Sequence, residues 1–164
     1  DARPLSIGLP PGSYPVEVAI ASLGDGDERI AAARICLRSS DPTTWMFALR
    51  QGQDAETVSE DDLLFGVDSG TAAFLSAEAA IEVSELLDET FDDQVTEAMD
   101  AVYRPTRKWA EIPLSNGELN MLICSTGFGD GSYPIFLGVD ASGEPVAVVA
   151  DFGVVLIDSD LLGP

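Results

Sequence analysis

Three aspartates stand where a rigid scaffold could bring carboxylates together for catalysis. Asp68 and Asp151 each follow an apolar run, and Asp130 lies within a glycine-rich loop. Paired carboxylates that share a proton can carry out acid and base chemistry. The chain contains no histidine, which removes the usual general base near neutral pH and every Ser-His or Cys-His pair. Asp68, Asp130 and Asp151 are therefore the candidate catalytic residues of a carboxylate-based or metal-assisted hydrolase.

Two of these aspartates open short motifs. Asp68-Ser69-Gly70-Thr71 looks like one half of an aspartic protease site, with Asp151-Phe152-Gly153 as the other half. Phe152, however, replaces the small hydroxyl residue that the second motif requires. Tripeptides of this kind arise often by chance, and turn residues at the ends of strands are the simpler interpretation.

The loop Gly127-Phe128-Gly129-Asp130-Gly131-Ser132 permits positive φ angles and a close approach of a ligand to the backbone. No helix pattern or lysine follows it, so it is not a phosphate loop. We predict binding residues at Gly129, Asp130, Gly131 and Tyr133. Asn120 and Tyr133 either assist Asp130 or satisfy backbone groups.

Metal and cofactor requirements follow from the residue types. Two cysteines and no histidine make zinc improbable. Calcium or magnesium would take oxygen ligands, of which Asp130 and Asp140 are the candidates. Ordinary Asp-Gly turn chemistry is the alternative for both residues, and no resident cofactor is predicted.

A repeated tetrapeptide organises the chain. Gly-Ser-Tyr-Pro occurs at 12–15 and at 131–134, each time before an apolar run, a turn rich in Gly and acid, and a second apolar run. Alternation with period two that is broken by such a turn predicts a β-hairpin. The second runs extend over 30–37 and 146–156. One hairpin is therefore expected to be used twice.

The segments between the hairpins are mixed. Residues 42–50 fit a strand or a short helix, 63–74 an apolar strand ending at a turn, and 119–125 a strand. Ser76 stands at the N-cap of a first helix, and Asp92 or Asp93 begins a second that Pro105 ends. The chain predicts an α+β fold, mainly an antiparallel β sheet or sandwich built around the duplicated hairpin, with a two-helix acidic insertion.

The excess of acidic residues indicates which kinds of partner the protein could bind. The chain of 164 residues carries 29 acidic and 8 basic residues, a formal charge of -21, with no Lys or Arg between Gln51 and Tyr103. Such a field repels phosphate backbones and favours a basic protein. We predict no nucleic-acid partner; the alternative for the acidic residues is a solvated surface. A non-enzymatic binding module, of the immunity or inhibitor kind, is thus the first functional hypothesis, and a purely structural domain is another.

The length fits one globular domain over 1–164. No apolar stretch reaches transmembrane length and no secretory leader is visible, so we expect no membrane association. The chain begins with Asp1, which suggests that an amino-terminal segment is missing. A disulfide between Cys36 and Cys124 stays open at this point.

The residues resemble a bacterial family, domain of unknown function 4241. The resemblance runs from about Leu9 to Leu156 and rests on several segments in order. These are 12–18, Arg29 with 31–34, Trp45 with 48–49, 65–72, 125–134, Gly138, Asp140, Gly143 and 151–152. Family members tend to have Cys, Asp and Trp at Ala73, Ser76 and Phe128, and usually carry a further amino-terminal stretch. The resemblance implies a bacterial, cytoplasmic setting and brings no established activity, ligand or catalytic residue.

Overall fold

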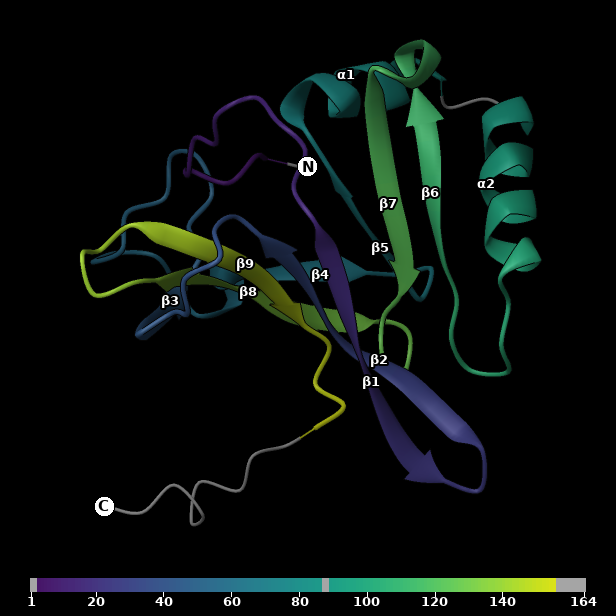
Figure 1. Ribbon diagram of the computed structural model, residues 1–164, viewed down its shortest axis with the longest axis horizontal. Helices are drawn as coiled ribbons and strands as arrows, with labels where there is room; N and C mark the ends of the chain where they lie inside the picture. Colours follow the sequence, from purple (N-terminus) through teal and green to yellow (C-terminus); the bar gives the residue numbers. More distant parts are fainter. Residues whose placement is uncertain (1–2, 87–88, 156–164) are drawn as a thin grey trace. The chain divides into compact units, whose positions relative to one another are not determined.

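The computed structural model describes residues 3–86 and 89–155 (Figure 1). Within these residues the strands form one sheet of six strands and one of three, mostly antiparallel, accompanied by two helices. The predicted α+β class and antiparallel architecture are thus confirmed. The chain divides into two compact units, which we describe separately: unit 1 takes in 1–21, 30–66 and 132–164, and unit 2 takes in 22–29 and 67–131. The single domain stays a prediction.

Both predicted hairpins form. The first joins β1 (Val16–Gly24) to β2 (Asp27–Cys36) through Asp25 and Gly26, whose φ angles of 53° and 81° are those of a type I′ turn. The second joins β8 (Gly131–Val139) to β9 (Pro145–Asp151), which pair antiparallel. The predicted second run to Leu156 ends as a strand at Asp151, and its last residue lies outside the described residues.

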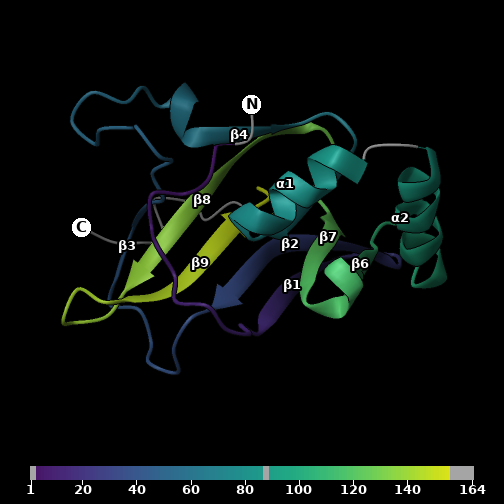
Figure 2. The ribbon, with the colours of Figure 1, turned by 90° about the horizontal axis from the view of Figure 1, so that it is seen from above.

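The two hairpins meet through their second strands, in the order β1, β2, β9, β8 (Figure 2). The N–H of Cys36 donates to the proline carbonyl of the first Gly-Ser-Tyr-Pro copy, and the register places Asp151 opposite the proline of the second. Cys36 and Asp151 are therefore equivalent positions. Arg34, two residues before Cys36, lies opposite Val149, two residues before Asp151. The duplication thus builds a sheet with a local two-fold axis between Arg34 and Val149.

The segment 42–50 contains a strand. β3 (Thr44–Phe47) pairs antiparallel with the end of β8, and β4 (Leu64–Val67) also pairs with β8. The loop between them ends in a single 3₁₀ turn, η1 (Asp61–Leu63). Unit 1 buries the apolar residues of β2, β8 and β9, with Phe152 at the end of β9 among its largest buried side chains.

Unit 2 is a three-stranded sheet with β7 (Leu119–Ser125) between β5 (Thr71–Leu75) and β6 (Trp109–Leu114). The helices α1 (Ala77–Leu86) and α2 (Glu89–Ala101) lie between β5 and β6 in the sequence, which confirms the two-helix insertion. Figure 1 shows α2 alongside β6. A second 3₁₀ turn, η2 (Ser115–Gly117), connects β6 to β7. No helix within the described residues is long and apolar enough to cross a membrane.

Helix capping and core packing explain where the two helices of unit 2 begin. The Oγ of Ser76 accepts the N–H of Ala79 at 3.1 Å, which confirms the predicted N-cap. The predicted start of the second helix at Asp92 or Asp93 is wrong, because α2 begins at Glu89. Its first turn includes Phe91, which is buried with Met99 against β6. Phe91 precedes the predicted start of the helix, so the sequence analysis did not place it in α2.

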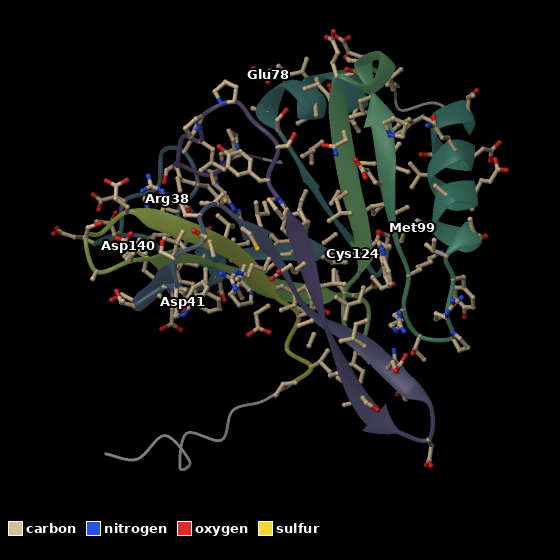
Figure 3. All side chains as sticks on the ribbon, viewed as in Figure 1. Arg38, Asp41, Glu78, Met99, Cys124 and Asp140 are labelled. Carbon is tan, nitrogen blue, oxygen red and sulfur yellow. The ribbon has the colours of Figure 1, made fainter. Side chains whose placement is uncertain are left out.

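The two cysteines are free thiols rather than a disulfide. Cys36 ends β2 in unit 1, whereas Cys124 is fully buried in β7 of unit 2 and is labelled in Figure 3. Burial raises the pKa of the Cys124 thiol to about 12. Cys124 is therefore a small apolar core residue and not a nucleophile at neutral pH.

Candidate functional site

The glycine-rich loop closes on itself. The Oγ1 of the fully buried Thr126 donates to the carbonyl of Gly129 at 2.8 Å, and the N–H of Gly129 donates back to the carbonyl of Thr126 at 2.6 Å. Gly129 has a φ of 111°, which only glycine adopts readily. Gly129, one of the two glycines predicted as binding residues, thus has a conformational role in a tight turn, whereas Gly131 begins β8.

Gly70 joins this loop to the Asp68 turn. Its N–H donates to Oδ1 of Asp130 at 2.8 Å, and its carbonyl accepts the N–H of Thr126 at 3.0 Å. A Cβ at Gly70 would lie 3.5 Å from Cα of Gly129, so the two loops are in van der Waals contact. The structure therefore brings Asp68 and Asp130 into adjoining loops of unit 2, where both residues are exposed.

Asp151 belongs to unit 1, at the end of β9, where its Oδ1 accepts the N–H of Gly153 at 2.9 Å. Asp140 also lies in unit 1 and organises the β8–β9 turn: its Oδ1 accepts the N–H and Oγ–H of Ser142 and the N–H of Glu144. These bonds, above all the one from the Ser142 hydroxyl, lower the pKa of Asp140. The meeting of Asp68, Asp130 and Asp151 stays a prediction.

The metal prediction gains no further support from the geometry. Among residues 3–86 and 89–155, no group of three or more His, Cys, Asp or Glu side chains is arranged to hold an ion. Asp130 and Asp140, the two predicted ligands, belong to different units. Calcium or magnesium at either residue stays a prediction.

The two assisting side chains have other contacts. Tyr133 is buried in unit 1, where its ring lies 5.5 Å from that of Phe152 in an edge-to-face arrangement and 6.0 Å from that of Phe65. Asn120 donates from Nδ2 to Oε1 of Glu111 at 2.6 Å, across the β6–β7 pair. Tyr133 thus takes part in aromatic packing and Asn120 in a cross-strand hydrogen bond.

A cluster that the sequence did not predict lies at the tip of the first hairpin, within unit 2. Thr106 has a φ of 122°, an unusual angle for a β-branched residue, and its Oγ1 bonds both backbone groups of Glu28. The Glu28 carboxylate accepts Nε and Nη2 of Arg107, whose guanidinium lies 5.6 Å from the centre of the Trp109 ring. The residues 28 and 106 are far apart in sequence, so no local pattern could have predicted this contact.

The outward face of α2 is acidic. Asp93, Glu97 and Asp100 are exposed at spacings of four and three residues, opposite the face that carries Phe91 and Met99. Like charges four residues apart destabilise a helix by about 0.2–0.5 kcal/mol per pair. An acid in the last turn also opposes the helix dipole. Lys108 Nζ approaches Asp100 Oδ1 at 3.2 Å, but α2 itself contains no basic residue.

Two open clefts of unit 2 are lined by residues other than the candidate aspartates. One lies between the helices and the end of β6 and is lined by Glu82, Leu86, Phe91 and Leu114, among others. A second lies at the end of α2 and is lined by Ala101, Val102, Arg104, Arg107 and Trp109. Neither cleft offers a substrate pocket to Asp68 or Asp130.

The fold and these contacts define an acidic α+β protein of mostly antiparallel sheets, in which Asp130, Asp140 and Asp151 each accept a backbone N–H in a turn or loop. Over residues 1–150 the chain matches the family described as "Protein of unknown function (DUF4241)", and it belongs to that family. The resemblance seen in the sequence is thus confirmed. No curated protein and no solved structure matches the chain.

Proposed function

We propose that the protein is a non-enzymatic, immunity- or inhibitor-like module of the bacterial cytoplasm that binds a basic protein through the outward face of α2. The observation that carries the proposal is the row of exposed acids Asp93, Glu97 and Asp100. The row reduces the stability of the helix that carries it. A surface whose charges all have the same sign raises the rate at which an oppositely charged protein associates.

The contacts of the candidate aspartates agree with this proposal. Asp130, Asp140 and Asp151 each accept a backbone N–H, as carboxylates in turns ordinarily do. A catalytic carboxylate usually lies in a pocket that excludes water and perturbs its pKa. Asp68 and Asp130 are instead exposed.

Neutralising the α2 face tests the proposal. The variant Asp93→Asn, Glu97→Gln, Asp100→Asn is expected to bind an oligolysine peptide about tenfold more weakly than the native protein at low salt. The matched control, Glu17→Gln, Asp25→Asn, Glu118→Gln, removes the same charge from exposed positions outside both α2 and the loops beside β3. Titration calorimetry at two salt concentrations provides the measurement. Equal losses in the two variants would show that net charge alone attracts the peptide, and the proposal would fail.

A hydrolase that uses Asp68, Asp130 and Asp151, with or without a metal ion, is the second candidate. The specific observation in its favour is the contact between the Asp68 turn and the Asp130 loop through Gly70. Turns placed by a rigid scaffold are common locations of catalytic residues. The turn role and the metal role of Asp130 predict different behaviour on substitution.

Substituting Asp130 separates the two roles. Asp130→Ala removes the acceptor of the Gly70 N–H and is expected to lower the free energy of unfolding by about 1–3 kcal/mol. Asp130→Asn keeps a side-chain oxygen at that place and should cost less. Thermal unfolding with calcium, magnesium or chelator provides the measurement, and we expect equal midpoints in all three. A midpoint that calcium or magnesium raises in the native protein but not in Asp130→Asn would instead establish a metal site.

A further inference from the structure

The edge strand β3 of unit 1 carries three consecutive exposed apolar side chains. Trp45, Met46 and Phe47 are 46%, 46% and 44% exposed. β3 pairs with β8 on one side and ends the order of the six-stranded sheet, as the described strands define it. Exposed apolar residues on an edge strand favour pairing with another chain unless charge, proline or a bulge prevents it. Residues 44–47 contain neither a charge nor a proline.

The backbone hydrogen-bonding groups of β3 alternate between the β8 side and the outer edge of the sheet. The N–H of Ala48 donates to the carbonyl of Ile135 at 2.7 Å, and the antiparallel register continues from there along β3. Hydrogen bonding to a neighbouring strand alternates along an antiparallel strand. The backbone groups of Met46, two residues before Ala48, therefore also bond β8. The N–H and C=O groups of Trp45 and Phe47 therefore point to the outer edge of the sheet, where an incoming strand would bond them.

The two aromatic rings beside that edge are held by β8. A Cβ at Gly138 would lie 2.8 Å from Cζ3 of Trp45, so the indole packs directly on the glycine backbone. The rings of Phe47 and Phe136 are 5.0 Å apart and tilted by 32°. Aromatic side chains that are fixed before binding lose little conformational entropy on association. Such side chains are typical anchors of protein interfaces.

The surroundings of β3 are acidic. Asp41 is exposed shortly before the strand, and Asp140 follows Val139, which lies opposite Thr44. Figure 3 labels both aspartates at this end of the sheet. The loop after β3 adds five exposed acids, namely Asp54, Glu56, Glu60, Asp61 and Asp62.

The neighbouring basic residues are engaged. Arg38 pairs with Glu144 at 2.8 Å, and the guanidinium of Arg50 donates to the carbonyl of Leu64. The acids around the edge outnumber these two arginines, so the net charge there complements a basic occupant. A second copy of this chain, with its own charge of -21, would be repelled.

We propose that β3 is a docking edge to which an extended, basic segment of another polypeptide adds as a further antiparallel or parallel strand. Backbone bonds to Trp45 and Phe47 would supply affinity, and the acidic surroundings would select lysine or arginine side chains. This inference goes beyond the proposed function, because it rests on a different surface in the other unit and does not require the α2 face.

An alternating Val-Lys peptide of about eight residues, long enough to span a typical strand, is the probe. At saturation we expect hydrogen exchange of the Trp45 and Phe47 amides, followed by NMR, to slow by about tenfold or more. The Met46 amide, which already bonds β8, should change little. An alternating Val-Glu peptide of the same length should leave all three amides unchanged. Uniform or absent slowing at the three amides would overturn the proposal.

Two variants distinguish binding at β3 from binding at the α2 face. Trp45→Ala is expected to weaken binding of the Val-Lys peptide, whereas the α2 variant should retain the exchange pattern at β3. Loss of that pattern in the α2 variant would place the peptide on α2 and overturn the β3 proposal alone. Slowed exchange at Trp45 and Phe47 that appears on raising the protein concentration without peptide would identify a second copy as the occupant, which also overturns it.

Discussion

Replacing Phe152 by alanine is expected to lower the free energy of unfolding by about 3–5 kcal/mol. Phe152 is only 1% exposed, and its ring packs edge-to-face on Tyr133 at 5.5 Å. Its N–H donates to the carbonyl of Ala31 at 2.8 Å, which ties the backbone in place. The surrounding residues cannot collapse fully into the space that the ring leaves, so the cost includes a cavity as well as lost burial. Urea denaturation gives the free energy.

Phe128→Ala is the matched control for this change. The same ring is removed, but Phe128 is 63% exposed and its described partner is the guanidinium of Arg29, 5.3 Å from the ring centre. An exposed cation–π contact contributes about 0.5–1 kcal/mol. A Phe152→Ala variant no less stable than Phe128→Ala would contradict the placement of Phe152 in the core.

The hairpins could be predicted because their signal is local. Asp25-Gly26 suits the two positive φ angles of a type I′ turn, and the apolar alternation on either side sets the strands. Ser76 is equally local, since an N-cap bonds an N–H three residues away. These features depend on neighbours in the sequence, which a pattern can show.

The elements that were missed or misplaced depend on tertiary contacts. The strand β6 contains Pro113, which argues against a central strand, but β6 lies at the edge of its sheet, where proline is tolerated. The early start of α2 depends on the burial of Phe91 against β6. Neither partner can be recognised from the local sequence alone.

The candidate site was predictable in part for the same reason. The turn interpretation, which the sequence offered as the alternative for Asp130, Asp140 and Asp151, agrees with their contacts, since each accepts a backbone N–H. The bond from Gly70 to Asp130 spans 60 residues, so the contact between their two loops could not be inferred from spacing. The exposure of Trp45 and Phe47 also required the sheet order, because alternation alone does not distinguish an edge strand from a central one.

Replacing Ile112 by alanine is expected to lower the free energy of unfolding of unit 2 by about 2–5 kcal/mol. Ile112 is 1% exposed in β6, in the same core cluster as Phe91 and Met99. Ile81→Ala is the matched control, because the same atoms are removed from a residue that is 63% exposed on α1. That change should stay within about 0.5 kcal/mol. Similar losses in the two variants would contradict the core assignment.

The same variant tests whether the chain is one domain. Its two tryptophans fall one in each unit, Trp45 in unit 1 and Trp109 in unit 2, so single-tryptophan proteins made by Trp→Phe replacement report each unit separately. If the units unfold as one cooperative domain, Ile112→Ala must shift the Trp45 and Trp109 transitions together, because a two-state transition looks the same to every probe. A shift confined to Trp109 would show that unit 2 unfolds on its own. The single-domain prediction would then be wrong, and the α2 and β3 surfaces would belong to independently folded parts of the chain.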